Sequence, residues 1–120
     1  MAFPHFLGYA DERGSGSGEG FNVNYPMPPD TGFTTWSNAL DDACQKISDY
    51  APDAVVISLG VDTFEHDPIS GFKLSSDDFT RYGERLGALK LPTLFVMEGG
   101  YAVAEIGLNT VNVLQGYEGA

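Results

Sequence analysis

The sequence predicts an α/β fold, in which an open parallel sheet has helices packed on its faces. Two nearly continuous apolar runs, residues 54–60 and 93–97, are typical of strands buried in a parallel sheet. Segments with the apolar spacing of a helix alternate with these strands, and such alternation implies right-handed β-α-β crossovers. The length of 120 residues suits one small domain. Within it we expect a glycine-rich loop region over residues 1–20 and the order β-α-β-α-β-α over residues 21–120.

The first part of the chain is predicted to be a loop followed by a short strand. From Gly14 to Gly20 the sequence alternates glycine with serine and glutamate and has no apolar periodicity, which predicts a loop. Residues 22–27 alternate polar and apolar side chains before Pro28 and Pro29. This pattern predicts a short strand that ends in a turn.

A helix is predicted over residues 35–50, because its apolar side chains recur at the spacing of one helical face. These side chains are Trp36, Ala39, Leu40, Ala43, Cys44, Ile47 and Tyr50. Cys44 is the single cysteine of the chain, and its place on this stripe predicts a buried, unreactive thiol. The apolar run at 54–60 then predicts a strand that is covered on both faces.

A second helix is predicted to begin after Ser75 and to end near Lys90. Ser75 and Asp78 have the spacing of a capping box, and Pro92 prevents the helix from continuing. The buried stripe of this helix is Phe79, Tyr82, Leu86 and Leu89. After the strand at 93–97 and a glycine pair, a third helix is predicted from the apolar positions Val103, Ile106, Val113, Leu114 and Tyr117.

The composition limits the classes of partner. Seventeen Asp and Glu residues against six Lys and Arg give a net charge of −11, so most of the surface would repel nucleic acid. The charge would favour a cationic ligand such as a polyamine, although an acidic, solvated surface is the simpler explanation. One cysteine excludes an internal disulfide and favours a cytoplasmic location. No apolar run approaches the roughly 20 residues of a membrane span, so we expect no membrane partner.

The candidate site lies where the two buried strands end, because ligands of open parallel sheets collect at the carboxyl ends of the strands. Asp62 follows the first strand, and its carboxylate could be a metal ligand or a catalytic acid, or it could cap its own loop. Tyr101 follows the second strand, and its hydroxyl could reach a developing oxyanion, or its ring could pack at a helix start. Glu98 could act as a base or accept from loop amides, and Gly99 and Gly100 would shape the loop or line the substrate site.

Other sites are not supported by the spacing of the residues. His66 and Asp67 lie near Asp62, but their spacing fixes no metal geometry. We expect His66 to be a loop residue, and Asp67, which precedes Pro68, to shape its loop through bonds from the side chain to the backbone. The G-x-G-x-x-G, P-loop and G-x-S-x-G motifs are absent, which argues against dinucleotide binding, P-loop chemistry and α/β-hydrolase chemistry.

Three segments together resemble a known family. They are GSGSGEGFNVNYPM, SLGVDTFEHDPISGFKLSSDDF and VMEGGYAVAEIGLN, which extend in this order over almost the whole chain. They resemble the histone deacetylase superfamily, and most closely its bacterial acetylpolyamine amidohydrolase branch. The resemblance implies a three-layer, arginase-like fold and a zinc hydrolase that removes acetyl groups from amines. It also implies that Asp62 is a zinc ligand and that Tyr101 polarises the acetyl carbonyl and stabilises the tetrahedral intermediate.

The resemblance covers only part of such a catalytic domain. The family's other two zinc ligands form an Asp-x-His motif, and its proton-transferring groups are a tandem histidine pair; the sequence contains neither. Catalytic zinc normally needs three protein ligands, so one aspartate cannot hold it. We therefore expect residues 1–120 to be the carboxy-terminal part of a deacetylase domain, which binds Zn²⁺ only in the complete protein.

Three functions remain open at the level of the sequence. The first is a zinc-dependent deacetylase that acts on acetylated polyamines, and the second is a deacetylase that acts on acetyl-lysine or another acetylated amine. The third is a binding or assembly module without catalysis, since the chain lacks two ligands and the histidine pair. The isolated chain is expected to be inactive and to associate with itself through an exposed sheet edge.

Overall fold

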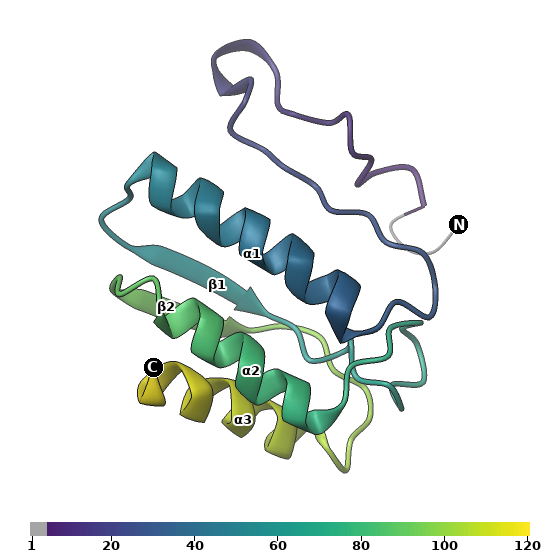
Figure 1. The fold of residues 1–120 in the computed structure, drawn as a ribbon. Coiled ribbons are helices and arrows are strands. Elements are labelled where there is room, and N and C mark those ends of the chain that lie inside the picture. Colours follow the sequence, from purple (N-terminus) through teal and green to yellow (C-terminus); the bar gives the residue numbers. More distant parts are fainter. Residues whose placement is uncertain (1–4) are drawn as a thin grey trace.

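The fold consists of a small parallel sheet and three long helices. The computed structural model describes residues 5–120, and its elements follow the order η1 (Gly16–Gly18), α1 (Phe33–Tyr50), β1 (Val55–Leu59), α2 (Ser76–Gly87), β2 (Thr93–Met97) and α3 (Ile106–Gly119). The strands β1 and β2 pair in parallel with Val55 opposite Thr93 and Leu59 opposite Met97. Figure 1 shows α2, the crossover between the strands, beside α3. The predicted α/β fold with a parallel sheet is confirmed.

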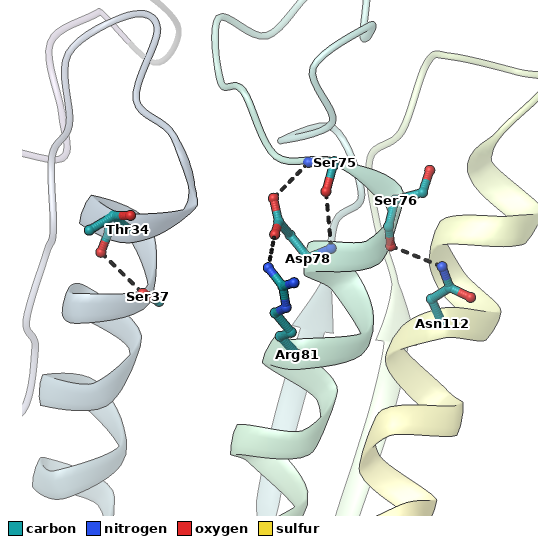
Figure 2. A network of polar contacts seen from close by, with 7 residues as sticks. All are labelled: Thr34, Ser37, Ser75, Ser76, Asp78, Arg81 and Asn112. Carbon is teal, nitrogen blue, oxygen red and sulfur yellow. Dashed lines mark hydrogen bonds and ion pairs between the residues drawn. The ribbon is translucent and has the colours of Figure 1, made fainter.

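The start of α2 has the capping box that its sequence predicts. The Ser75 hydroxyl accepts a hydrogen bond from the Asp78 amide at 3.3 Å, and the Asp78 carboxylate accepts one from the Ser75 amide at 2.8 Å (Figure 2). Arg81 donates to the same carboxylate at 3.1 Å. The box satisfies two amides that have no partner within the helix, and a negative charge there suits the helix dipole.

The helices α2 and α3 approach each other at glycines. A Cβ atom at Gly83 would overlap the carbonyl group of Val113, and one at Gly116 would overlap the carbonyl group of Thr80. Nearer the start of α2, the Asn112 side chain donates to the Ser76 carbonyl oxygen at 2.9 Å (Figure 2). Glycine at these positions therefore lets the two backbones touch.

The close helix contact gives a prediction about stability. Gly83→Ala is expected to lower the free energy of unfolding by about 1–3 kcal/mol, because the added methyl group meets backbone that cannot move aside. The matched control is Gly107→Ala in α3, where nothing lies within 4 Å of the added Cβ. That change should raise stability by about 0.4–1 kcal/mol. Urea unfolding measures the free energy of unfolding of both variants. Equal changes in the two variants would contradict the close packing of α2 on α3.

One hydrophobic core joins all three helices to one face of the sheet. Its buried members are Cys44, Leu59, Val61, Phe64, Leu74, Phe79, Tyr82, Leu86 and Val113, and Ile57 and Phe95 of the strands pack against them. The Trp36 ring of α1 stacks on the Tyr82 ring of α2 with 4.7 Å between centroids. Cys44 is fully buried, as predicted, and burial raises the pKa of its thiol. The thiol therefore stays protonated and unreactive at neutral pH.

The opposite face of the sheet is open, which differs from the prediction of a strand covered on both faces. Val56 of β1 is 65% exposed and Leu94 of β2 is 60% exposed. The physical reason is that α1, α2 and α3 all pack on the face that carries Ile57 and Phe95. Within residues 5–120, no helix remains to cover the second face.

The strand predicted at residues 22–27 is also absent. This segment runs past α1 without pairing with a strand in the described part of the chain (Figure 1). Its polar side chains bond elsewhere: Asn24 donates to the Tyr9 carbonyl oxygen at 2.9 Å, and Tyr25 donates to Asp42 of α1 at 2.6 Å. An alternating segment forms a strand only when a neighbouring strand pairs with it, and no strand among residues 5–120 pairs with this one. The order from Phe33 onward is therefore α-β-α-β-α.

A cleft of about 840 Å³ separates the amino-terminal segment from α1. Its lining includes Phe21, Val23, Lys46, Tyr50 and Val56, and it lies away from the carboxyl ends of the strands. Among residues 5–120 there is no helix with the length and apolar character needed to cross a membrane.

Candidate functional site

The loops after β1 and β2 remain paired beyond the ends of the strands. The Glu98 amide donates to the Leu59 carbonyl oxygen at 2.8 Å, and the Val61 amide donates to the Gly99 carbonyl oxygen at 2.8 Å. These two bonds fix the position of one loop relative to the other. The residues that follow each strand are therefore held side by side at the carboxyl edge of the sheet.

The side chains of Asp62 and Tyr101 converge at Gly99. A Cβ atom placed on Gly99 would lie 2.7 Å from Asp62 Oδ2 and 3.1 Å from the Tyr101 hydroxyl oxygen. The other carboxylate oxygen of Asp62 faces Gly60, where a Cβ atom would lie 3.0 Å from it. The Asp62 carboxylate thus sits between two glycines, beside a phenol from the other loop. These two residues, which the sequence places at separate strand ends, occupy one site.

Gly100 has a conformation that side chains rarely adopt. Its φ is +154°, and a Cβ atom there would lie 2.7 Å from the Val61 side chain and 3.2 Å from that of Ile106. Glycine is therefore required at this turn for steric reasons.

Glu98 and His66 do not join Asp62 and Tyr101 at Gly99. Both are exposed, and His66 faces Glu65 with 3.5 Å between Nε2 and the carboxylate. In the described part of the chain, the Glu98 carboxylate accepts no hydrogen bond, so it does not bind loop amides as one of its two interpretations requires. The prediction that His66 is a surface loop residue agrees with its exposure.

Asp67 is the carboxylate that binds loop amides. It is 7% exposed, and its Oδ1 accepts from the amides of Ile69 at 2.9 Å and Ser70 at 3.0 Å, as the sequence predicts for a loop-shaping aspartate. Its Oδ2 accepts from the Tyr101 amide at 2.8 Å. Burial alone would raise the pKa of Asp67, but the amides of Ser70, Ile69, Tyr101 and Ala102 hold it below its usual value. Asp67 therefore remains charged and ties the two loops together.

Sequence patterns do not reveal the hydrogen bond that the Tyr101 amide donates to Asp67. The two residues are 34 positions apart, and no local pattern links them. The Asp-Pro pair signals a turn but does not tell which distant amide the second carboxylate oxygen will accept.

Tyr82 of α2 is a buried neighbour of the site. Burial raises the pKa of its hydroxyl, and the negative charge of Asp62 raises it further. Tyr82 therefore stays protonated beside the Asp62 carboxylate. The sequence assigns Tyr82 to the buried stripe of its helix, which is confirmed, but does not show that it lies near Asp62.

The described residues can supply one ligand of a metal site. The Asp62 carboxylate accepts no hydrogen bond from residues 5–120, so both of its oxygens are available. No group of three His, Cys, Asp or Glu side chains in the same range could hold a metal ion. A metal ion bound at Asp62 would therefore take its remaining ligands from another polypeptide segment.

Known proteins resemble this chain over nearly its full length. The histone deacetylase domain matches residues 1–117. Acetylpolyamine amidohydrolase 1 of Pseudomonas aeruginosa is 67% identical over 120 residues, which are all of this chain and 35% of the relative. Acetylpolyamine amidohydrolase of Mycoplana ramosa is 54% identical over 118 residues, or 98% of this chain and 35% of the relative. The chain thus spans about a third of the length of these curated relatives.

Solved structures have the same fold. The crystal structure of acetylpolyamine aminohydrolase from Burkholderia pseudomallei superposes with a TM-score of 0.93 at 40% identity, covering 97% of this chain and 34% of that one. The HDA15 HD domain superposes with a TM-score of 0.90 at 30% identity, covering 98% of this chain and 34% of that one. The match in sequence and in fold leads to one conclusion. The chain belongs to the histone deacetylase domain family.

Proposed function

We propose that residues 1–120 form one side of the active site of a zinc-dependent deacetylase that removes acetyl groups from acetylated polyamines. The observation that carries this proposal is the convergence of Asp62 and Tyr101 at Gly99. The relatives support it, because a chain 67% identical to this one is an acetylpolyamine amidohydrolase in Pseudomonas aeruginosa. The remaining ligands and the proton-transferring histidines come from polypeptide outside these residues, since the sequence has neither an Asp-x-His motif nor a histidine pair.

The residues of this chain have distinct roles in the proposed mechanism. Zinc, when bound, would supply a water of lowered pKa and polarise the acetyl carbonyl group. The Asp62 carboxylate would hold the metal, and the two glycines that face it, Gly60 and Gly99, leave room for its oxygens. The Tyr101 hydroxyl donates a hydrogen bond to the acetyl oxygen, where negative charge develops as the amide is attacked. Asp67 stays charged and hydrogen-bonded to backbone, so it takes no part in proton transfer.

The charge of the chain favours a cationic substrate. A singly acetylated polyamine keeps at least one ammonium group, and the net charge of −11 attracts it over distances of about 8–10 Å at physiological salt. Acetyl-lysine in a peptide is the second candidate, because the family whose model matches residues 1–117 is the histone deacetylase domain. Both substrates place an acetyl group at the site. They differ in what is attached to the acetylated amine, which is a chain with an ammonium group in the polyamine and a peptide in acetyl-lysine.

A hybrid enzyme tests the proposal. In it, residues 1–120 replace the matching third of Acetylpolyamine amidohydrolase 1 of Pseudomonas aeruginosa. The hybrid enzyme is expected to bind one zinc ion and to hydrolyse acetylputrescine faster than an acetyl-lysine peptide. Preference for the peptide would favour the second candidate. A folded, zinc-loaded hybrid enzyme without activity on either substrate would support the third possibility, a binding or assembly module.

Gly99→Ala gives a separate prediction about the metal. The added methyl group would lie 2.7 Å from Asp62 Oδ2 and must displace the carboxylate. The zinc affinity of the hybrid enzyme should fall about tenfold or more, as it does when a metal ligand loses its orientation. The control is Gly71→Ala, where the nearest atom is a Pro29 side-chain carbon at 3.5 Å and the affinity should not change. Competition with a chelator measures both, and equal affinities would remove Asp62 from the metal site.

A further inference from the structure

We propose that Asp67 is the positioning residue that sets the Tyr101 hydroxyl against Asp62 in the reaction. This inference rests on the proposed function, since it assigns a role within the same site. Its basis is a single buried carboxylate that accepts from amides of both loops: Ile69 and Ser70 on its own loop, and Tyr101 on the other.

The Asp67 loop is joined to the core by backbone hydrogen bonds. Two hydrogen bonds join the two ends of this loop. The Glu65 amide donates to the Leu74 carbonyl oxygen at 2.7 Å, and the Leu74 amide donates to the Thr63 carbonyl oxygen at 3.1 Å. Leu74 is fully buried in the core. The Asp67 amide also donates to the Phe64 carbonyl oxygen at 3.0 Å. These bonds fix Asp67 relative to the core independently of its hydrogen bond with the Tyr101 amide.

Tyr101 depends on Asp67 because its own segment has few other restraints. The residue is 45% exposed, and two glycines precede it. On the amino-terminal side, the Gly99 carbonyl oxygen accepts from Val61; on the carboxy-terminal side, the Ala102 carbonyl oxygen accepts from Glu105 at 2.9 Å at the start of α3. Between these two points, the bond from the Tyr101 amide to Asp67 at 2.8 Å fixes the backbone that carries the phenol.

Asp67 acts through Tyr101 and does not touch the reacting groups. Both of its oxygens accept from backbone amides, and the residue is only 7% exposed. Asparagine would keep the volume but offers one acceptor oxygen, and its amino group would face an amide N–H. Asp67→Asn must therefore release one of the two loops.

The kinetic test is a double-mutant cycle in the hybrid enzyme. Asp67→Asn is expected to lower kcat about 10- to 100-fold with KM and zinc content unchanged, because a displacement of about 1 Å can cost a hundredfold in rate. In the Tyr101→Phe background, Asp67→Asn should lower kcat by less than about twofold, since the hydroxyl it positions is already absent. Equal losses of kcat in both backgrounds would overturn the proposal, as would loss of zinc from the Asp67→Asn variant.

Asp78→Asn is the matched control. Asp78 is also 7% exposed and also accepts from backbone, but it caps α2 and does not contact Tyr101. The Asp78→Asn variant should have a lower free energy of unfolding and a kcat within about twofold of the parent. A kcat loss equal to that of Asp67→Asn would assign the effect to general destabilisation and overturn the proposal.

Amide hydrogen exchange separates this proposal from the proposed function. Asp67→Asn should speed exchange of the Tyr101 amide at least about tenfold in the zinc-loaded hybrid enzyme, because that amide loses its acceptor. Asp78→Asn should leave it unchanged. Unchanged exchange in Asp67→Asn would overturn the positioning role even in an active enzyme. A hybrid enzyme that hydrolyses no acetylated amine contradicts the proposed function, and the exchange result still decides whether Asp67 fixes Tyr101.

Discussion

Tyr101→Phe is expected to lower kcat of the hybrid enzyme about a hundred- to thousandfold on acetylputrescine. The reason is that the hydroxyl lies beside Asp62, where it can donate to the acetyl oxygen as negative charge develops there. Phenylalanine keeps the ring and removes only this donor. Zinc content and KM should change little, because the donor acts mainly in the transition state. Steady-state kinetics together with metal analysis measure the three quantities.

Tyr50→Phe is the control for Tyr101→Phe. Tyr50 is an exposed tyrosine at the end of α1, beside the amino-terminal end of β1 and away from the carboxyl ends of the strands, and loss of its hydroxyl should leave kcat unchanged. Turnover by Tyr101→Phe within about threefold of the parent would show that the hydroxyl has no part in the mechanism.

Asp62→Ala is expected to abolish zinc binding at the concentrations at which the parent hybrid enzyme is fully loaded. Loss of a partner that only orients a metal ligand costs about 10- to 100-fold in affinity, so loss of the ligand itself should cost more. Activity should be lost with the metal. Chelator competition and metal analysis of the purified variant give the affinity, and the unfolding transition shows whether the fold is retained.

Glu65→Ala is the control for Asp62→Ala. Glu65 is an acidic residue of the same loop, three positions away, and its exposed side chain faces His66. The Glu65→Ala variant should bind zinc like the parent. A loss of zinc binding in both variants would point to the total charge of the loop. Full zinc loading of Asp62→Ala would exclude Asp62 as a ligand.

The local elements of the fold follow from the sequence. The capping box at Ser75 is a contact between residues three positions apart, and the strand at Thr93–Met97 and the buried Cys44 are indicated by apolar side chains spaced within a few residues of each other. Periodicity and capping report such contacts directly. The placement of Asp62 and Tyr101 at one edge was also predictable, because parallel strands end on the same side of their sheet.

Two features of the fold depended on partners that the sequence pattern does not identify. The alternation at residues 22–27 is compatible with a strand, but the segment forms side-chain bonds to the preceding loop and to α1 instead. The apolar run of β1 shows that its side chains favour burial. It does not show that all three helices would pack on one face and leave Val56 exposed.

Three features can be read from the amino-acid sequence: the family resemblance, the alternating α/β order from the first long helix onward, and the two side chains at the strand ends. The folded chain adds that both side chains meet at Gly99 and that Asp67 joins the loops that carry them. The physical reason is that a hydrogen bond between residues 34 positions apart depends on how two loops are placed by the sheet and the core. Short-range patterns of polarity record which side chains are buried, and they do not record which distant amide a buried carboxylate will accept.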